Sequence, residues 1–228
     1  MKRITFAIII ALFTVLIFSA CTKKVEENGL TREINKIVPD SILTNMINQG
    51  MPINGGNKPP TIEGTYIATP FELVSTTVPD DPEEHVFSDF IVTFKNFNAR
   101  KLTLELDYEN GPETGTGLAS FVVGEDNKFS MFCEIKSTQL LLFKAEAIMV
   151  ISGTLTENGI EDFYLANFMI DNHGNTVPFG IIDDDLGVWI PNGTGRVIYD
   201  SDGIAEKTGA TKSISVDKNS SSIFTIPE

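Results

Sequence analysis

Leu102-Thr103-Leu104-Glu105-Leu106-Asp107-Tyr108 is the stretch that decides the fold. Its apolar side chains alternate with threonine and acidic side chains, which is the period of two expected of a half-buried β-strand. The stretch therefore predicts a strand that turns one face toward a core and the other toward solvent.

Similar strand patterns recur along most of the chain. Apolar alternation or apolar runs appear at residues 90–94, 118–123, 129–136 and 163–171, and turn residues such as Glu157-Asn158-Gly159 separate them. About eight to ten short strands joined by hairpin turns predict a mainly β fold, either an antiparallel β-barrel or, as the alternative, a β-sandwich. No helix-length crossover separates consecutive strands, which excludes parallel βαβ units. We expect the apolar faces of residues 90–106 and 129–151 to line the interior.

The first strands and the end of the chain are less regular. Residues 65–68 and 71–74 predict either a pair of strands or one strand bent at Pro70. Asn96 to Ala99 predicts a turn, residues 188–190 and 197–199 predict short strands, and the apolar residues of 214–226 predict a final strand.

A short helical segment precedes the strands, over residues 31–50. Thr31 is placed to cap a first piece, Pro39 interrupts the segment, and Gly50 is a natural stop for the second piece. Residues 30–228 are expected to form one domain, with this segment covering one end of it.

The first 20 residues predict a secretory signal peptide. Lys2 and Arg3 precede an apolar run of about 15 residues, which is short for a membrane span, and small residues end it. Phe18-Ser19-Ala20-Cys21 resembles the lipobox of bacterial lipoproteins. That resemblance implies cleavage before Cys21, acylation of its thiol, residues 21–29 as a tether, and the membrane as a partner through the lipid. The alternative is an ordinary secretory signal followed by a coincidental cysteine.

The negative charge of the chain limits the kinds of molecule that we expect it to bind. The formal net charge is −14, and removing residues 1–20 takes away two basic residues and no acidic one, which leaves about −16. Nucleic acid requires clustered Lys and Arg, so it is not an expected partner. Such a surface favours solubility.

The sequence contains few groups suited to catalysis. Its two histidines, His85 and His173, lie in acidic or turn-like stretches, and Cys133 lies among apolar residues as a buried thiol would. No nucleophile elbow, zinc motif or phosphate loop occurs. We therefore expect a protein that is not an enzyme and needs no cofactor. A glycoside hydrolase, which needs two facing carboxylates, is the less favoured alternative.

Four residues are candidates for binding. Trp189 is the single tryptophan and would be the platform for a sugar ring, and Tyr66 is a second aromatic candidate. Asp183 and Asp185 offer oxygen ligands of the kind that calcium prefers. For each of them the structural alternative is a core residue or a solvated turn.

The stretch from Pro59 to Tyr66, Pro-Pro-Thr-Ile-Glu-Gly-Thr-Tyr, follows the lipobox and the helical segment. This arrangement resembles cell-envelope lipoproteins of the Bacteroides kind, several of which have lipocalin-like barrels. The resemblance implies an outer-membrane lipoprotein with a barrel that binds a small apolar or glycan-derived ligand. A surface β-sandwich module for glycan capture is the alternative.

Overall fold

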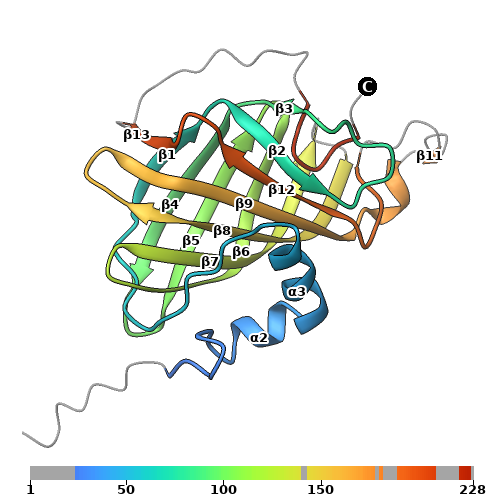
Figure 1. Ribbon diagram of the computed structural model, residues 1–228. Helices are drawn as coiled ribbons and strands as arrows, with labels where there is room; N and C mark the ends of the chain where they lie inside the picture. Colours follow the sequence, from blue (N-terminus) through green and yellow to red (C-terminus); the bar gives the residue numbers. More distant parts are fainter. Residues whose placement is uncertain (1–23, 140–142, 178–179, 182–188, 209–220, 227–228) are drawn as a thin grey trace, which may run out of the picture.

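Antiparallel β-strands make up most of the structure (Figure 1). The computed structural model describes residues 24–139, 143–177, 180–181, 189–208 and 221–226. Eleven of its strands form one sheet, namely β1 (Gly64–Ala68), β2 (Phe71–Thr76), β3 (Val86–Phe87), β4 (Phe90–Asn98), β5 (Thr103–Asn110), β6 (Glu113–Glu125), β7 (Lys128–Gln139), β8 (Phe143–Leu155), β9 (Gly159–Asp171), β12 (Gly195–Asp200) and β13 (Ile204–Thr208). Strands β10 (Thr176–Val177) and β11 (Gly180–Ile181) pair separately. The expectation of a mainly β, antiparallel fold is confirmed.

The pairing of the strands returns on itself. Strands β4 to β9 pair in chain order, β1 pairs with β4, and β13 pairs with both β1 and β9. Strand β12 also pairs with β9, beside residues 164–168, and then leads to β2 and β3. Strands β1, β4 to β9 and β13 thus form a closed circuit. We call this circuit, together with β12, β2 and β3, the ring.

The expected pairing of the first two strands is wrong. Strand β1 pairs with β4 and β13, whereas β2 pairs with β12 and β3. Residues 64–68 and 71–76 are two separate strands with the cis Thr69–Pro70 bond between them, so the alternative of one strand bent at Pro70 is confirmed only for the place of the break.

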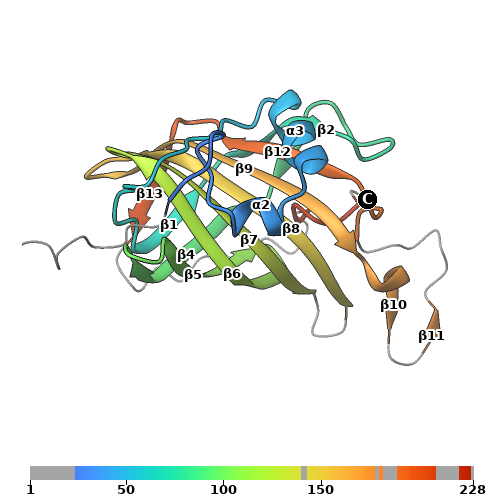
Figure 2. The same ribbon diagram turned by 90° about the horizontal axis from the view of Figure 1, so that it is seen from below.

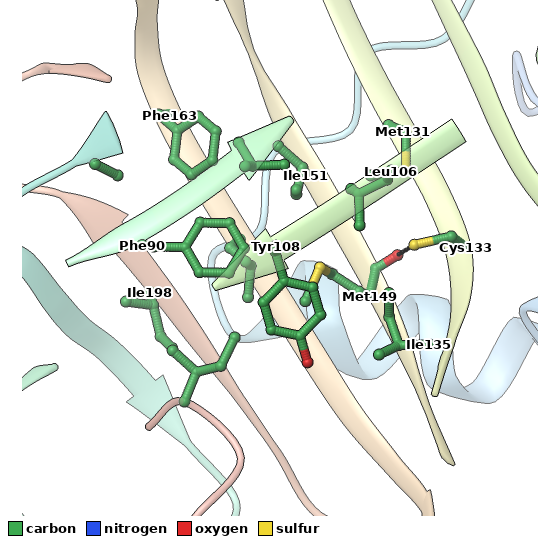
Figure 3. Close-up of a cluster of buried hydrophobic side chains, with 14 of the residues drawn as sticks. Phe90, Leu106, Tyr108, Met131, Cys133, Ile135, Met149, Ile151, Phe163 and Ile198 are labelled. Atoms are coloured by element: carbon green, nitrogen blue, oxygen red, sulfur yellow. Dashed lines mark hydrogen bonds between the residues drawn. The ribbon is translucent and has the colours of Figure 1, made fainter. Parts of the chain in front are cut away.

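The alternating side chains of the central strands fill the interior of the ring, as expected (Figure 3). Leu104, Leu106 and Tyr108 are buried, while Glu105 between them is exposed. The aromatic rings of Phe90 and Tyr108 stack with their centroids 5.4 Å apart. The expected short strands are longer here, because β6 to β9 have 13, 12, 13 and 13 residues.

Two helices lie against the outside of the ring (Figure 2). They are α2 (Ile34–Ile37) and α3 (Asp40–Asn48), and Pro39 separates them as the sequence predicts. The Thr31 hydroxyl accepts a hydrogen bond from the Ile34 N–H. Leu43 and Met46 of α3 belong to a second apolar cluster, which includes outward side chains of β7, β8 and β12. One part of the sheet is thus buried on both faces.

Three local expectations differ from the structure. Strand β4 continues to Asn98, through most of the turn expected at Asn96 to Ala99, and the chain turns from Ala99 onward. Near residue 189 there is an isolated bridge between Trp189 and Thr225 rather than a strand. Residues 221–226 form a turn that carries this bridge, so they are not a strand, and residues 214 and 216 lie outside the described part.

Within the described residues, neither helix has the length and apolar character needed to cross a membrane.

Candidate functional site

Polar side chains gather inside the ring, toward the end where β5 meets β6. Asn110 and Glu113 flank the β5–β6 turn, Tyr108 precedes them on β5, Asn167 comes from β9, and Arg196 comes from β12. All five are buried, with at most 2% of their surface exposed. We call these five residues the mouth cluster. They stand out because most of the other buried side chains among the described residues are apolar.

The mouth cluster holds the backbone of residues 221–226, which we call the C-terminal segment (Figure 1, dark red). The Ile223 N–H donates to Asn110 Oδ1 at 2.7 Å, and the Ile223 carbonyl accepts from Asn167 Nδ2 at 2.7 Å. Arg196 Nη1 donates to the carbonyls of Ile223 and Thr225 at 2.8 and 2.9 Å. The Ile190 N–H donates to the Phe224 carbonyl, and Ser88 donates to the Ser221 carbonyl. These hydrogen bonds go to main-chain atoms of the C-terminal segment, so they do not depend on which side chains the segment carries.

Arg196 is fixed by a second set of contacts. Its Nε and Nη2 atoms donate to the two Asp81 oxygens at 2.7 and 2.5 Å, in the bidentate geometry that arginine and carboxylate favour. Both side chains are buried, and the guanidinium lies 5.2 Å from the centre of the Phe87 ring. A buried charge is tolerated when it is paired and hydrogen-bonded, and here the guanidinium meets both conditions.

Glu113 is the buried carboxylate of the cluster. Its oxygens accept hydrogen bonds from the hydroxyls of Tyr108, Ser137 and Ser222, the last in the C-terminal segment. Burial raises the pKa of Glu113 from 4.5 to about 7, although these hydrogen bonds and the charge of Arg196 act in the opposite direction. Near neutral pH this carboxyl therefore changes between a proton donor and a charged acceptor.

The Tyr108 ring lies over Gly115 of the next strand, β6, where a residue larger than glycine would clash with it. A Cβ atom added to Gly115 would lie 2.2 Å from Cε1 of the Tyr108 ring. Gly115 thus leaves room for the ring, which places the Tyr108 hydroxyl on Glu113. Burial first, and then the charge of Glu113, raise the pKa of Tyr108.

Apolar side chains of the C-terminal segment complete the packing. Ile223 and Phe224 are fully buried and belong to the same cluster as the interior side chains of the ring. The site therefore combines an apolar interior with a few converging polar groups and a perturbed carboxyl, which is the composition typical of a ligand site.

The two aromatic binding candidates lie in the core. Trp189 is 1% exposed and pairs with Thr225, so its ring offers no free face to a sugar while the segment is in place. Tyr66 is buried against Phe94. Trp189 thus lies beside the C-terminal segment that the mouth cluster holds, whereas Tyr66 belongs to the interior packing.

Other candidates are placed as follows. Cys21, Asp183 and Asp185 lie outside the described residues. Cys133 is buried, and burial raises the pKa of its thiol, which agrees with the expectation of an inert core cysteine. His85 pairs with the Ser221 hydroxyl at the edge of the mouth cluster, while His173 stays in a turn beside Asp171. Burial first, and then Arg196, lower the pKa of His85.

No group of three or more metal-ligating side chains occurs within the described ranges. A hollow of about 390 Å³ on the outside of the sheet is lined by threonines and by Asp107, Glu109 and Lys136. Those side chains suit a polar ligand, but the aromatic residue of that hollow, Tyr108, is buried.

Reasoning from sequence missed the mouth cluster. We did not single out Asn110, Glu113, Asn167 or Arg196 as candidates. One signal was present, since Arg196 directly precedes the apolar pair Val197-Ile198 in a short strand. A charged residue within such a strand has to find a buried partner, and here it finds Asp81.

Comparison with known proteins adds no relative: no protein-family model, curated protein or solved structure matches this chain.

Proposed function

We propose that this chain is a lipid-anchored protein of the bacterial cell envelope that binds a small ligand inside a lipocalin-like barrel. The ligand is apolar or glycan-derived and carries a polar group. One observation carries the proposal: five buried polar side chains converge at one end of an apolar interior, and four of them hydrogen-bond a separate chain segment instead of completing the sheet.

The pairing of the strands supports a barrel over a sandwich. Strand β13 joins β1 to β9, so β1, β4 to β9 and β13 form a closed circuit, from which β12, β2 and β3 extend at β9 within the same sheet. A sandwich would instead show two separate sheets packed face to face. Barrels of this kind leave their ligand site at one end of the interior, which is where the mouth cluster lies.

The contacts of the C-terminal segment suggest how a ligand would be held. Ile223 and Phe224 mark the volume for its apolar part. Asn110, Asn167 and Arg196 present one acceptor and several donors to its polar part. The Glu113 carboxyl faces hydroxyl groups, so it favours a ligand that carries a hydroxyl.

The membrane anchor is proposed from the sequence alone. The lipobox-like Phe18 to Cys21 supports acylation at Cys21, and the short stretch that follows supports a tether to the outer membrane. Binding of a ligand rather than catalysis is proposed because Glu113 has no second free carboxylate in the mouth cluster, and Asp81 is paired with Arg196. This arrangement does not favour the glycoside hydrolase alternative.

The test is a binding titration with residues 22–228 and the fluorescent fatty acid 11-(dansylamino)undecanoic acid, followed by displacement with lipid and glycan extracts. We expect saturable binding of the probe, and we expect Glu113→Gln to weaken by about tenfold the displacement of the probe by lipids or glycans that carry a hydroxyl, the effect of losing one hydrogen bond to a charged group. Glu109→Gln on the exposed face of β5 is the matched control and should have no effect. The absence of saturable binding, or an equal loss in both variants, would refute the proposed site.

A further inference from the structure

We propose that residues 221–226 are a built-in competitor of the ligand: they occupy the mouth cluster in the free protein and leave it when the ligand binds. This inference rests on the proposed function, because it assigns an occupant to the same site.

The segment is held mainly by side chains and not by strand pairing. Among the described residues, only the bridge between Trp189 and Thr225 joins it to another part of the chain in the manner of a strand. Its other main-chain contacts go mostly to side chains, namely those of Asn110, Asn167 and Arg196. A ligand with one donor and two acceptors can replace each of these bonds without disturbing the sheet.

Departure of the segment would uncover a mouth cluster that keeps its other contacts. Arg196 keeps its two bonds to Asp81 when the segment leaves, so its charge stays paired. Asn110 keeps its bond from Nδ2 to the Ser88 carbonyl, and Glu113 keeps those from Tyr108 and Ser137. The cluster is thus supported independently of the segment, which is what a binding site requires in order to survive opening.

Both ends of the segment reach the surface. Ser221 is half-buried and Ile226 is 43% exposed, while the residues between them are buried. The segment dips into the mouth and comes out within six residues, so it can detach without threading through the ring. Such short, locally held pieces open at lower free energy than the paired strands around them.

Trp189, the single tryptophan of the chain, bridges to Thr225 of the segment. It is 1% exposed, and its neighbour Ile190 donates its N–H to the Phe224 carbonyl. Departure of the segment removes Thr225, which bridges to Trp189, and Phe224, which bonds to Ile190, so we expect the indole to become more exposed. The fluorescence of Trp189 therefore reports directly whether the segment is bound.

The experiment compares Phe224→Ala with Phe129→Ala in residues 22–228. Both phenylalanines are fully buried in the same cluster, but Phe129 lies in β7, paired with Gly124 near the opposite turn. For Phe224→Ala we expect acrylamide quenching of Trp189 to rise severalfold and the dansyl fatty acid to bind about tenfold more tightly, with an unchanged β-sheet circular dichroism spectrum. Phe129→Ala should change neither property.

Hydrogen exchange on the unmodified chain provides the second measurement and does not depend on how any variant folds. We expect the amide of Ile223 to exchange through local opening, faster than those of β7 and β8, and to exchange faster still when the dansyl fatty acid is present. Exchange of Ile223 only at the rate of the β7 and β8 amides, with Trp189 unquenched in a folded Phe224→Ala variant, would overturn the competition and leave the ligand site standing. A released segment without any gain in fatty-acid binding would instead overturn the ligand site itself, and the competition with it.

Discussion

Asn110 and Ile223 are 113 positions apart in the sequence, and the Oδ1 atom of Asn110 accepts a hydrogen bond from the Ile223 N–H at 2.7 Å. Asn110 also donates from Nδ2 to the Ser88 carbonyl at 2.7 Å. The Asn110 side chain thus links β5 to Ser88 and to Ile223. Its oxygen and its nitrogen each form a hydrogen bond with a backbone group.

Asn110→Ala should therefore destabilise the fold by about 1–3 kcal/mol, because it leaves a buried N–H and a buried carbonyl without a partner. Urea unfolding followed by circular dichroism measures the change. The matched control is Asn127→Ala in the exposed β6–β7 turn, where a change within about 0.5 kcal/mol is expected. Equal stability of the two variants would show that the segment does not depend on this amide.

Arg196→Met should cost more, about 3–5 kcal/mol, because it leaves Asp81 charged and unpaired in the interior. Replacing both partners, Arg196→Met with Asp81→Leu, removes the uncompensated charge and should recover part of the loss. Thermal unfolding of the single and double variants gives the coupling between the two residues. Additive effects of the two substitutions would contradict the buried ion pair.

The pH dependence of stability should report on Glu113. Burial raises the pKa of its carboxyl to about 7 in the folded protein, against 4.5 when unfolded. The folded state then holds the proton more tightly, so the stabilising contribution is complete below pH 4.5 and is lost as the pH rises through 7. The total change is about 3 kcal/mol. Glu113→Gln should flatten this part of the curve in urea titrations between pH 4 and 8, and a persisting slope of the same size would contradict the assignment.

Asp200, like Glu113, should make the folded protein less stable as the pH rises. It is 2% exposed, and burial followed by the charge of Asp202 raises its pKa to about 7, although backbone hydrogen bonds from Asp202 and Thr69 act in the opposite direction. The charged form is therefore penalised at high pH. Asp200→Asn should raise the melting temperature at pH 8 and change it little at pH 4. A lower melting temperature at pH 8 would mean that the carboxylate has a stabilising partner.

Lipid attachment is testable by labelling. Cells expressing the full chain and fed radiolabelled palmitate should label the protein, and Cys21→Ser should abolish the label. Cys133→Ala serves as the control, because that thiol is buried in the interior and burial raises its pKa. Label that depends on Cys133, or none at all, would contradict the anchor.

The sequence allowed accurate prediction of features that depend on neighbouring residues. The alternation at residues 102–108, the β6–β7 and β8–β9 hairpins and the break at Pro39 all follow from local spacing and turn residues. The strands that pair with β1 and β2 could not be predicted from local spacing, because cross-strand pairing depends on which edges remain free once the rest of the sheet has formed.

The mouth cluster was unpredictable for the same reason. Glu113 contacts Ser222, 109 positions away, and Arg196 contacts Asp81, 115 positions away. Taken singly, each of these residues has the polar character of a turn or a strand edge. Only the closed arrangement of strands places them in one buried space, and no short pattern encodes that arrangement.

The dual pairing of β13 has a consequence for how the chain reaches its native state. Residues 204–208 bridge β1 and β9, so both of those edges lack a neighbour there until the last tenth or so of the polypeptide has emerged. Contacts between parts of the chain so far apart form slowly, and the exposed edges invite intermolecular association in the meantime. A chain stalled or clipped just before residue 204 should therefore be the species most prone to aggregate.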